Sequence, residues 1–249
     1  MTTTQRGFTL IEMAIVLIII TILIGGLAVP LSTQIQARRI AETNKTLEEA
    51  KEAIIGYAMT HKSTDGNQRP YLPCPDTNGD GREEARVTGQ IDPSLNGGCP
   101  LTYGYFPWVD LGGAAHDAWG NRLRYVVTDK LANRISGFSP STDQNTGAWK
   151  NIASSSGCAP VNVAAGVPFV LISHGPNGWG ARNVNGNTLA APGGADENEN
   201  LLGDNACYVS RAPSKPGGAG GEFDDLVTWL PFGLLVSRAC PAGCPLPVN

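Results

Sequence analysis

One short segment of the chain carries oxygen-bearing side chains at alternate positions, a spacing that can bind a metal ion. The segment is CPDTNGDGREE, residues 74–84, and its alternating residues are Asp76, Asn78 and Asp80, followed by Gly81. Oxygens at every second position of a tight turn can converge on a hard cation, and this order matches the first half of a calcium-binding loop. The segment is therefore a candidate calcium site.

The second half of the calcium pattern is missing from this segment. The position at which a calcium loop carries its bidentate glutamate is held by Val87, so Glu83 or Glu84 would have to complete the coordination shell. The alternative is a metal-free turn, closed by Asx side chains and glycines and held by Cys74. Both interpretations stay open at the level of sequence.

Histidine and acidic side chains elsewhere do not form a recognisable catalytic pattern. The chain has three histidines, His61, His116 and His174, and His174 follows Ser173 at the end of a strand-like run. No G-x-S-x-G or H-E-x-x-H motif accompanies them, so we expect no enzyme. The acidic run at 196–199 is a second metal candidate, and we interpret it as a solvated loop.

The cysteines are typical of a disulfide-bonded, extracytoplasmic region. There are six, Cys74, Cys99, Cys158, Cys207, Cys240 and Cys244, and no C-x-x-C motif or zinc-ribbon spacing occurs among them. Six cysteines allow fifteen pairings, and disulfides are the default outside the cytoplasm. We expect the sequential pairing, Cys74–Cys99, Cys158–Cys207 and Cys240–Cys244, because each pair brackets one loop-rich stretch.

Composition limits the class of protein further. The 249 residues suffice for one large domain or two small ones, and 31 glycines with 18 prolines indicate long loops. The net charge is −4, and the 18 Lys and Arg residues are scattered along the chain. Nothing forms the basic stripe of a nucleic-acid binder, so we expect no nucleic-acid partner.

Two features of the N-terminal region require an explanation: the length of its apolar run and the presence of one acidic residue. No residue from Met13 to Leu31 is charged, and at ~1.5 Å per residue a helix over this stretch is roughly 28 Å long, about one membrane core. A secretory signal peptide or a simple membrane anchor would explain the apolar run. Neither explains Glu12, or the short polar leader that ends in Arg6-Gly7.

The segment RGFTLIE, residues 6–12, resembles the leader junction of type IV prepilins and of type II secretion pseudopilins. The resemblance implies cleavage after Gly7 by a prepilin peptidase, which then methylates Phe8. Glu12 becomes the fifth residue of the mature chain. In this family that glutamate pairs with the N-terminal amine of a neighbouring subunit, here Phe8, and sets the register of the filament. A buried charge needs such a partner.

The same resemblance implies an organisation and a location. We expect a leader peptide (1–7), a transmembrane and filament-core helix (8–31), an amphipathic continuation of that helix (32–62) and a periplasmic head (63–249). The expected fold is α+β and pilin-like: a long helix packed on a small, mainly antiparallel sheet with disulfide-stapled loops. Such a minor pilin or pseudopilin lies in the bacterial inner membrane, and its partners are other pilin or pseudopilin subunits, prepilin peptidase and the inner-membrane assembly platform.

Periodicity places the elements that follow. Apolar residues recur at helical spacing after Pro30, as Ala37, Ile40, Leu47, Ala50, Ile54 and Tyr57. Gly25, Gly26 and Pro30, which precede this stripe, should kink or locally melt the helix. Strand-like runs lie at 121–129, 167–175, 207–212 and 223–231, whereas 140–157 and 191–205 read as irregular.

One turn adds to the resemblance, and two other functions stay open. The sequence DAWGN, residues 117–121, is similar to a turn that precedes a strand in major pseudopilins, with Asp117 and Asn121 closing the turn and Gly120 at a positive φ. The alternatives to a filament subunit are a membrane-anchored periplasmic binding or adhesion module, and an anchored hydrolase that uses His174. Absence of cleavage after Gly7 would favour the first of these.

Overall fold

The computed structural model describes residues 7–89, 96–145, 148–203, 205–218 and 220–245, except for the side chains of 25–30. The chain divides into two compact units, one ending at Ala41 and the other beginning at Glu42. Helix α1 (Leu10–Thr60) contributes to both units, and all strands lie in the second. The chain is therefore α+β, as the sequence predicts.

Helix α1 is continuous through Gly25, Gly26 and Pro30, so the expected local melting at these residues is wrong, whereas the expected kink stays a prediction. A proline removes only one backbone donor from a helix, and a helix that is already nucleated on both sides propagates through such a position. No helix among the described residues combines the length and the apolarity that crossing a membrane requires.

The second-unit part of α1 buries one face. Four members of the predicted stripe are buried there, Leu47, Ala50, Ile54 and Tyr57, whereas Ala37 and Ile40, in the first unit, are exposed. The buried face begins at Thr43, which the stripe did not include. Its Oγ1 accepts the backbone N–H of Ala118 at 3.2 Å, so a hydrogen bond satisfies the buried hydroxyl group.

Two sheets make up the rest of the head. The larger one is fully antiparallel and has the order β1 (Tyr103–Tyr105), β2 (Arg124–Val127), β5 (Phe169–Ser173), β7 (Leu226–Trp229). The smaller one has the order β4 (Ala164–Val167), β3 (Lys150–Ala153), β6 (Cys207–Val209), with β3 antiparallel to β4 and parallel to β6. Short helices connect the strands: α2 (Trp108–Leu111), α3 (Ala195–Leu201), α4 (Phe232–Ala239), and the 3-10 turns η1 (Asp129–Leu131) and η2 (Ser156–Cys158).

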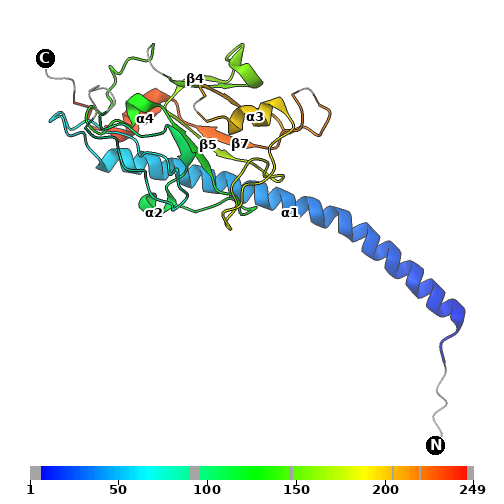
Figure 1. The fold of residues 1–249 in the computed structure, drawn as a ribbon. Coiled ribbons are helices and arrows are strands. Elements are labelled where there is room, and N and C mark those ends of the chain that lie inside the picture. The colour runs from blue at the N-terminus through cyan, green and yellow to red at the C-terminus, as the bar shows by residue number, and fades with distance from the viewer. Residues whose placement is uncertain (1–6, 90–95, 146–147, 204, 219, 246–249) are drawn as a thin grey trace, which may run out of the picture. The chain divides into compact units, whose positions relative to one another are not determined.

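The larger sheet is the middle layer of the head. Phe169 and Leu171 of β5 pack in one apolar cluster with Leu47 and Ile54 of α1, whereas Val170 and Ile172 pack in a second cluster with side chains of the smaller sheet. Successive strand residues point to opposite faces, so all five residues of β5 are buried. Figure 1 shows β5 and β7 between α1 and β4.

The expected strands and loops can be compared with these elements. The four strand-like runs contain β2, β5, β6 and β7, one in each, so these predictions are confirmed. The stretches 140–157 and 191–205 were expected to be irregular, and that expectation is wrong: the first contains β3 and the start of η2, and the second contains α3. Strand β3 forms by pairing with distant strands, and the polar sequence of α3 has no apolar stripe to reveal a helix.

Three disulfides close the loops of the head. They join Cys74 to Cys99, Cys158 to Cys207 and Cys240 to Cys244, with Cα–Cα distances of 5.4, 5.6 and 5.0 Å. This is the sequential connectivity expected from the spacing. The Cys158–Cys207 bridge joins η2 to the start of β6, so it reinforces the edge at which β3 and β6 run parallel.

Candidate functional site

The start of α1 is a capping box formed by Thr9 and Glu12. The backbone N–H and the hydroxyl of Thr9 both donate to Oε2 of Glu12 at 2.8 Å, and the N–H of Glu12 donates to Oγ1 of Thr9 at 3.3 Å. Because Thr9 precedes the first helical residue and Glu12 is the third, the pair satisfies backbone donors that the helix itself cannot. Glu12 therefore has a structural partner within its own chain.

The capping box uses only one oxygen of Glu12. Among the described residues, no hydrogen-bond partner is found for Oε1, and the side chain is exposed. Phe8, Met13, Ile15 and Val16 line a shallow hollow with Glu12, so apolar side chains lie beside the exposed carboxylate. The first turn of the helix thus offers a negatively charged oxygen in an apolar setting.

The helix around this carboxylate is apolar on all sides and exposed in the single chain. From Phe8 to Ile24 the large apolar side chains are between 44% and 89% exposed. A helix that is apolar all round is normally buried in protein or in lipid, and contiguous exposed apolar surface marks an interaction site. This part of α1 is therefore a candidate interaction surface.

The peptide bond between Gly7 and Phe8 is accessible. Both residues are exposed and lie before the first helical residue, Leu10. A Cβ atom built at Gly7 would have no atom within 4 Å, so nothing in the described chain covers this position. A peptidase that binds an extended segment can reach this bond without unwinding the helix.

The candidate calcium loop is closed by protein hydrogen bonds around Asp76. This fully buried carboxylate accepts the backbone N–H groups of Asn78, Gly79 and Gly81 at 3.1, 2.6 and 2.8 Å. Oδ1 of Asn78 accepts the N–H of Asp80, as in an Asx turn. Calcium binding in this loop stays a prediction, and the geometry of Asp76 is that of a turn closed by its own backbone.

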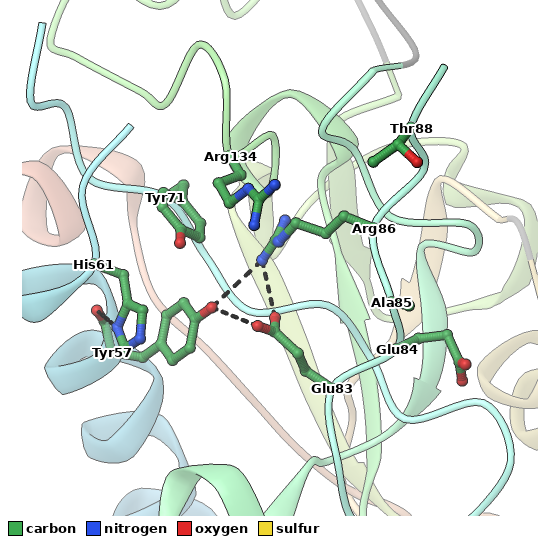
Figure 2. Close-up of a pocket in the computed structure, with 9 residues that line it drawn as sticks. All are labelled: Tyr57, His61, Tyr71, Glu83, Glu84, Ala85, Arg86, Thr88 and Arg134. Carbon is green, nitrogen blue, oxygen red and sulfur yellow. Dashed lines mark hydrogen bonds and ion pairs between the residues drawn. The ribbon is translucent and has the colours of Figure 1, made fainter. Parts of the chain in front are cut away.

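Glu83, the residue proposed to complete the calcium shell, faces a different set of groups. Its Oε1 accepts the hydroxyl of Tyr57 at 2.6 Å, and its Oε2 accepts the N–H of Cys74 at 2.8 Å and Nη2 of Arg86 at 2.9 Å. Figure 2 shows the contacts among Tyr57, Glu83 and Arg86, which line a hollow of about 460 Å³. Burial and the neighbouring Glu83 raise the pKa of Tyr57, so its hydroxyl stays a donor. The network ties α1 to the loop.

The structure does not assemble a catalytic group from the histidines. His174 is 3% exposed, and the neighbouring Ser173 is fully buried with its Oγ donating to Oδ2 of Asp117 at 2.6 Å. His61 stacks on Tyr57 with ring centroids 3.7 Å apart, and His116 is exposed. None of these arrangements presents a nucleophile beside a base at an open surface.

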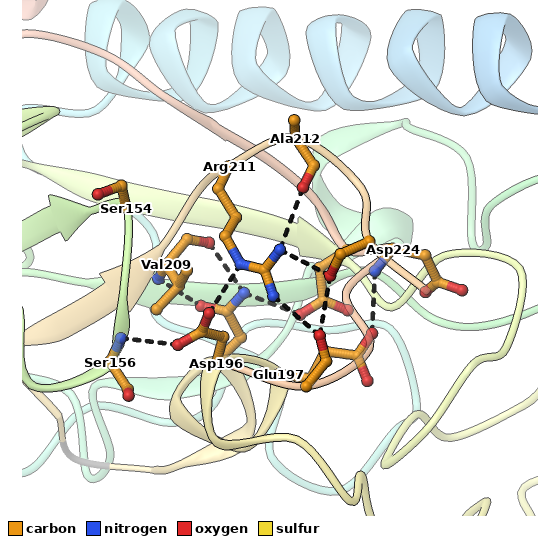
Figure 3. Close-up of polar contacts among 12 residues, drawn as sticks. Ser154, Ser156, Asp196, Glu197, Val209, Arg211, Ala212 and Asp224 are labelled. Carbon is orange, nitrogen blue, oxygen red and sulfur yellow. Dashed lines mark hydrogen bonds and ion pairs between the residues drawn. The ribbon is translucent and has the colours of Figure 1, made fainter. Parts of the chain in front are cut away.

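The acidic run at 196–199 is not a solvated loop, which corrects the expectation for it. Asp196 and Glu197 lie on α3 and are only 2% and 1% exposed. Asp196 accepts Nε of Arg211 at 2.7 Å and the N–H of Ser156 at 2.9 Å, as Figure 3 shows. Arg211, distant in the sequence, pairs with the buried carboxylate of Asp196, and no pattern in the neighbouring sequence indicates that partner.

One part of the N-terminal site was missed at the level of sequence although a signal for it exists. Thr9-Leu10-Ile11-Glu12 is a T-x-x-E capping box directly before an apolar run. It assigns Glu12 a role at the helix start that is independent of any neighbouring subunit.

Comparison with known proteins bears on the same region. Residues 2–28 match the family model of the prokaryotic N-terminal methylation motif, the type IV pilin signature. No curated protein and no solved structure matches the chain. The match includes the accessible Gly7–Phe8 bond and the Thr9–Glu12 capping box, and the head lies outside it.

Proposed function

Because the chain carries the type IV pilin signature, we propose that it is a structural subunit, a minor pilin or pseudopilin, of a type IV pilus or a type II secretion-like filament. The observation that carries the proposal is the motif at 2–28, together with the exposed stretch of helix inside it, residues 13–24, which has no charged residue. Such a helix needs neighbours, and packing of identical helices in a filament supplies them.

Processing is the first step of the proposed function. Prepilin peptidase cleaves after Gly7 and methylates the new N-terminal residue, Phe8. The exposure of both residues and their place before the first helical turn support this assignment. The seven residues removed are then a leader and have no role in the mature fold.

Assembly is the second step. The methylated amine of Phe8 moves into the apolar core of the filament, where a cation requires a negative partner. We assign that role to Glu12 of a neighbouring subunit. Its Oε2 is held by Thr9 of its own chain, and its Oε1 has no partner among the described residues, so one carboxylate can serve both contacts. A single charged pair in an apolar interface then sets the register.

The partners and the location follow from this route. The proposed partners are prepilin peptidase, the inner-membrane assembly platform and other pilin or pseudopilin subunits. Residues 8–31 hold the subunit in the inner membrane before assembly, and the head lies in the periplasm. The three disulfides of the head suit that oxidising compartment.

Intact-mass and N-terminal peptide spectrometry of the membrane-extracted protein tests the proposal, in cells with and without prepilin peptidase. We expect a chain that begins at Phe8 with one added methyl group when the peptidase is present, and a chain that retains residues 1–7 when it is absent. A Glu12→Gln variant is the matched control, because cleavage should survive the loss of this charge. An uncleaved chain in both strains would refute the proposal and favour an anchored binding module.

A further inference from the structure

A hollow of about 460 Å³ lies on the head beside the end of α1, and the proposed function does not use it. Its walls come from the end of α1, from the loops between α1 and β1 and from the segment that follows η1. Ligand pockets in proteins measure about 300–1,000 Å³, so this hollow can hold a small molecule. Its lining includes the side chains of Tyr57, His61, Tyr71, Arg86, Thr88 and Arg134, which Figure 2 shows.

One wall of the hollow is held in place before any ligand binds. The side chain of Arg86 is 5% exposed, and its guanidinium lies 4.7 Å from the centre of the Tyr71 ring and pairs with Oε2 of Glu83 at 2.9 Å. Arg86 also donates to the backbone carbonyls of Leu72 and Ala132. Because these contacts fix the ring and the guanidinium, a ligand would have little ordering of this wall to offset.

Arg134 brings a positive charge to the same hollow. Its N–H donates to the carbonyl of Gly97 at 2.8 Å, and Nη1 of Arg86 donates to the same oxygen at 3.4 Å, so the two arginines are neighbours. Arg134 is exposed, and its guanidinium has no hydrogen bond or ion pair among the described residues. In Figure 2 both guanidinium groups lie beside Tyr71. Since Glu83 already compensates Arg86, the charge of Arg134 is left for a ligand.

The second carboxylate of the lining is engaged elsewhere. Oε2 of Glu84 accepts the hydroxyl of Thr77, and Figure 2 shows this carboxylate turned away from Arg134. The fork of an arginine matches the oxygens of a carboxylate or a phosphate. The hollow therefore favours a ligand with an anionic group.

Neutral polar groups line the hollow together with this cation. In the described part of the chain, the hydroxyls of Tyr71 and Thr88 and Nε2 of His61 have no hydrogen-bond partner. Hydroxyls both donate and accept, and an imidazole nitrogen does either, so a ligand rich in hydroxyl groups can use all three. The rings of Tyr57 and His61, stacked 3.7 Å apart, add apolar surface. This combination fits the polar and apolar faces of a sugar.

The lining argues against two other kinds of ligand. No residue of a described strand lines the hollow, so it presents no sheet edge to an extended peptide. A single uncompensated arginine cannot follow the repeated phosphates of a nucleic acid. A compact ligand with one anionic group remains.

We propose that this hollow binds a sugar that carries one anionic group, either a carboxylate, as in the units of acidic polysaccharides, or a phosphate. Arg134 pairs with the anionic group, and Tyr71, Thr88 and His61 contact the hydroxyls of the sugar ring. All lining residues belong to the head, so binding requires neither cleavage after Gly7 nor filament assembly.

The test measures binding to the full-length protein by saturation-transfer NMR, in a zwitterionic detergent without a sugar headgroup and at low ionic strength, because salt screens exposed charges. The probes are glucuronate, glucose 6-phosphate and glucose. At least one of the two anionic sugars should bind about 10-fold more tightly than glucose, the gain expected of one charge-assisted hydrogen bond. The tighter of the two identifies the anionic group.

Substitution of Arg134 locates the site. Arg134→Ala should weaken binding of the anionic sugar about 10-fold and remove the preference over glucose. Its Tm should stay within about 2 °C of the wild type, because the side chain is exposed. Arg134→Lys keeps the charge without the fork and should lie between the two. The matched control is Arg238→Ala, which removes a partly exposed arginine that pairs with Glu52 outside the hollow and should bind as the wild type does.

Three results would overturn the proposal. The first is a wild-type protein that binds neither anionic sugar more tightly than glucose. The second is an Arg134→Ala variant that binds as the wild type does. The third is an equal loss in Arg238→Ala, which would indicate attraction to the overall charge of the head instead of a site. Processing and filament assembly are measured separately, so the site can fail while the proposed function holds.

Discussion

Replacing Asp117 with alanine should lower the stability of the head substantially, because one buried carboxylate closes the turn before β2 and anchors it to β5. Asp117 is 2% exposed. Its Oδ1 accepts the N–H groups of Trp119 and Asn121, both at 2.9 Å, and its Oδ2 accepts the hydroxyl of Ser173 at 2.6 Å. Gly120 within the turn has φ +82°, as the sequence predicts.

The magnitude follows from the donors left without a partner. An unsatisfied buried donor costs about 1–3 kcal/mol, and Asp117→Ala leaves three donors unpaired. Because Trp119 is only half-buried, water can reach part of the turn, and we expect a loss of about 3–6 kcal/mol in the free energy of unfolding. Asp117→Asn keeps an acceptor for the two backbone N–H groups, and the hydroxyl of Ser173 can rotate to accept from the amide. That variant should lose about 1 kcal/mol.

Thermal unfolding of the full chain in detergent, followed by circular dichroism, measures both variants. For a domain of this size each kcal/mol shifts Tm by about 2–4 °C, so Asp117→Ala should melt about 6–24 °C below the wild type and Asp117→Asn only a few degrees below. Ser173→Ala should resemble Asp117→Asn, because it removes one of the three hydrogen bonds. The reasoning fails if the alanine and asparagine variants melt together, or if alanine lowers Tm by less than about 3 °C.

Three further predictions concern assembly, a disulfide and acid stability. Glu12→Gln should be processed normally and fail to enter filaments, since glutamine can still cap the helix but carries no charge for a neighbour's amine; a sheared-filament fraction measures this, and normal assembly would refute the register role. Removing the Cys158–Cys207 bridge, which spans 49 residues, by a double serine substitution should cost about 4 kcal/mol, and an unchanged denaturation midpoint would contradict that estimate. Burial alone raises the pKa of Asp65, but hydrogen bonds from Ser63, Arg69 and Asn67 hold it below the usual range, so its stabilising contribution is complete above about pH 4 and is lost as the pH falls further. Asp65→Asn should therefore flatten the acid side of the stability profile, and an unchanged acid side would count against this role.

The methylation motif and the apolar run could be predicted because their information is local. The T-x-x-E cap was missed although its signal is equally local, since it lies in the same stretch of sequence and helix hydrogen bonds join residues close in the chain. The turn at Asp117 is local in the same way, and its closure by Asp117 and Gly120 follows from residue type alone.

The four strands that the sequence reveals differ in a physical respect from the elements that it conceals. Strand β5 reads as an unbroken apolar run because it is buried on both faces. Strand β3 has no such signal, and it exists because it pairs with β4 and, in parallel, with β6 more than fifty residues further along the chain. Helix α3 likewise depends on contacts with segments that follow it, such as the pair between Asp196 and Arg211.

The sequence by itself determined the processing signal, the apolar helix, the cysteine-stapled α+β class and the turn before β2. Only the tertiary structure decided which acidic side chains are buried and which groups they pair with. Glu83, which reads as a metal ligand, pairs with Tyr57 and Arg86, whereas Glu197, which reads as solvated, is buried against Asp224. The physical reason is that burial and charge pairing depend on which distant segments meet, and a carboxylate's neighbours in the sequence do not specify those meetings.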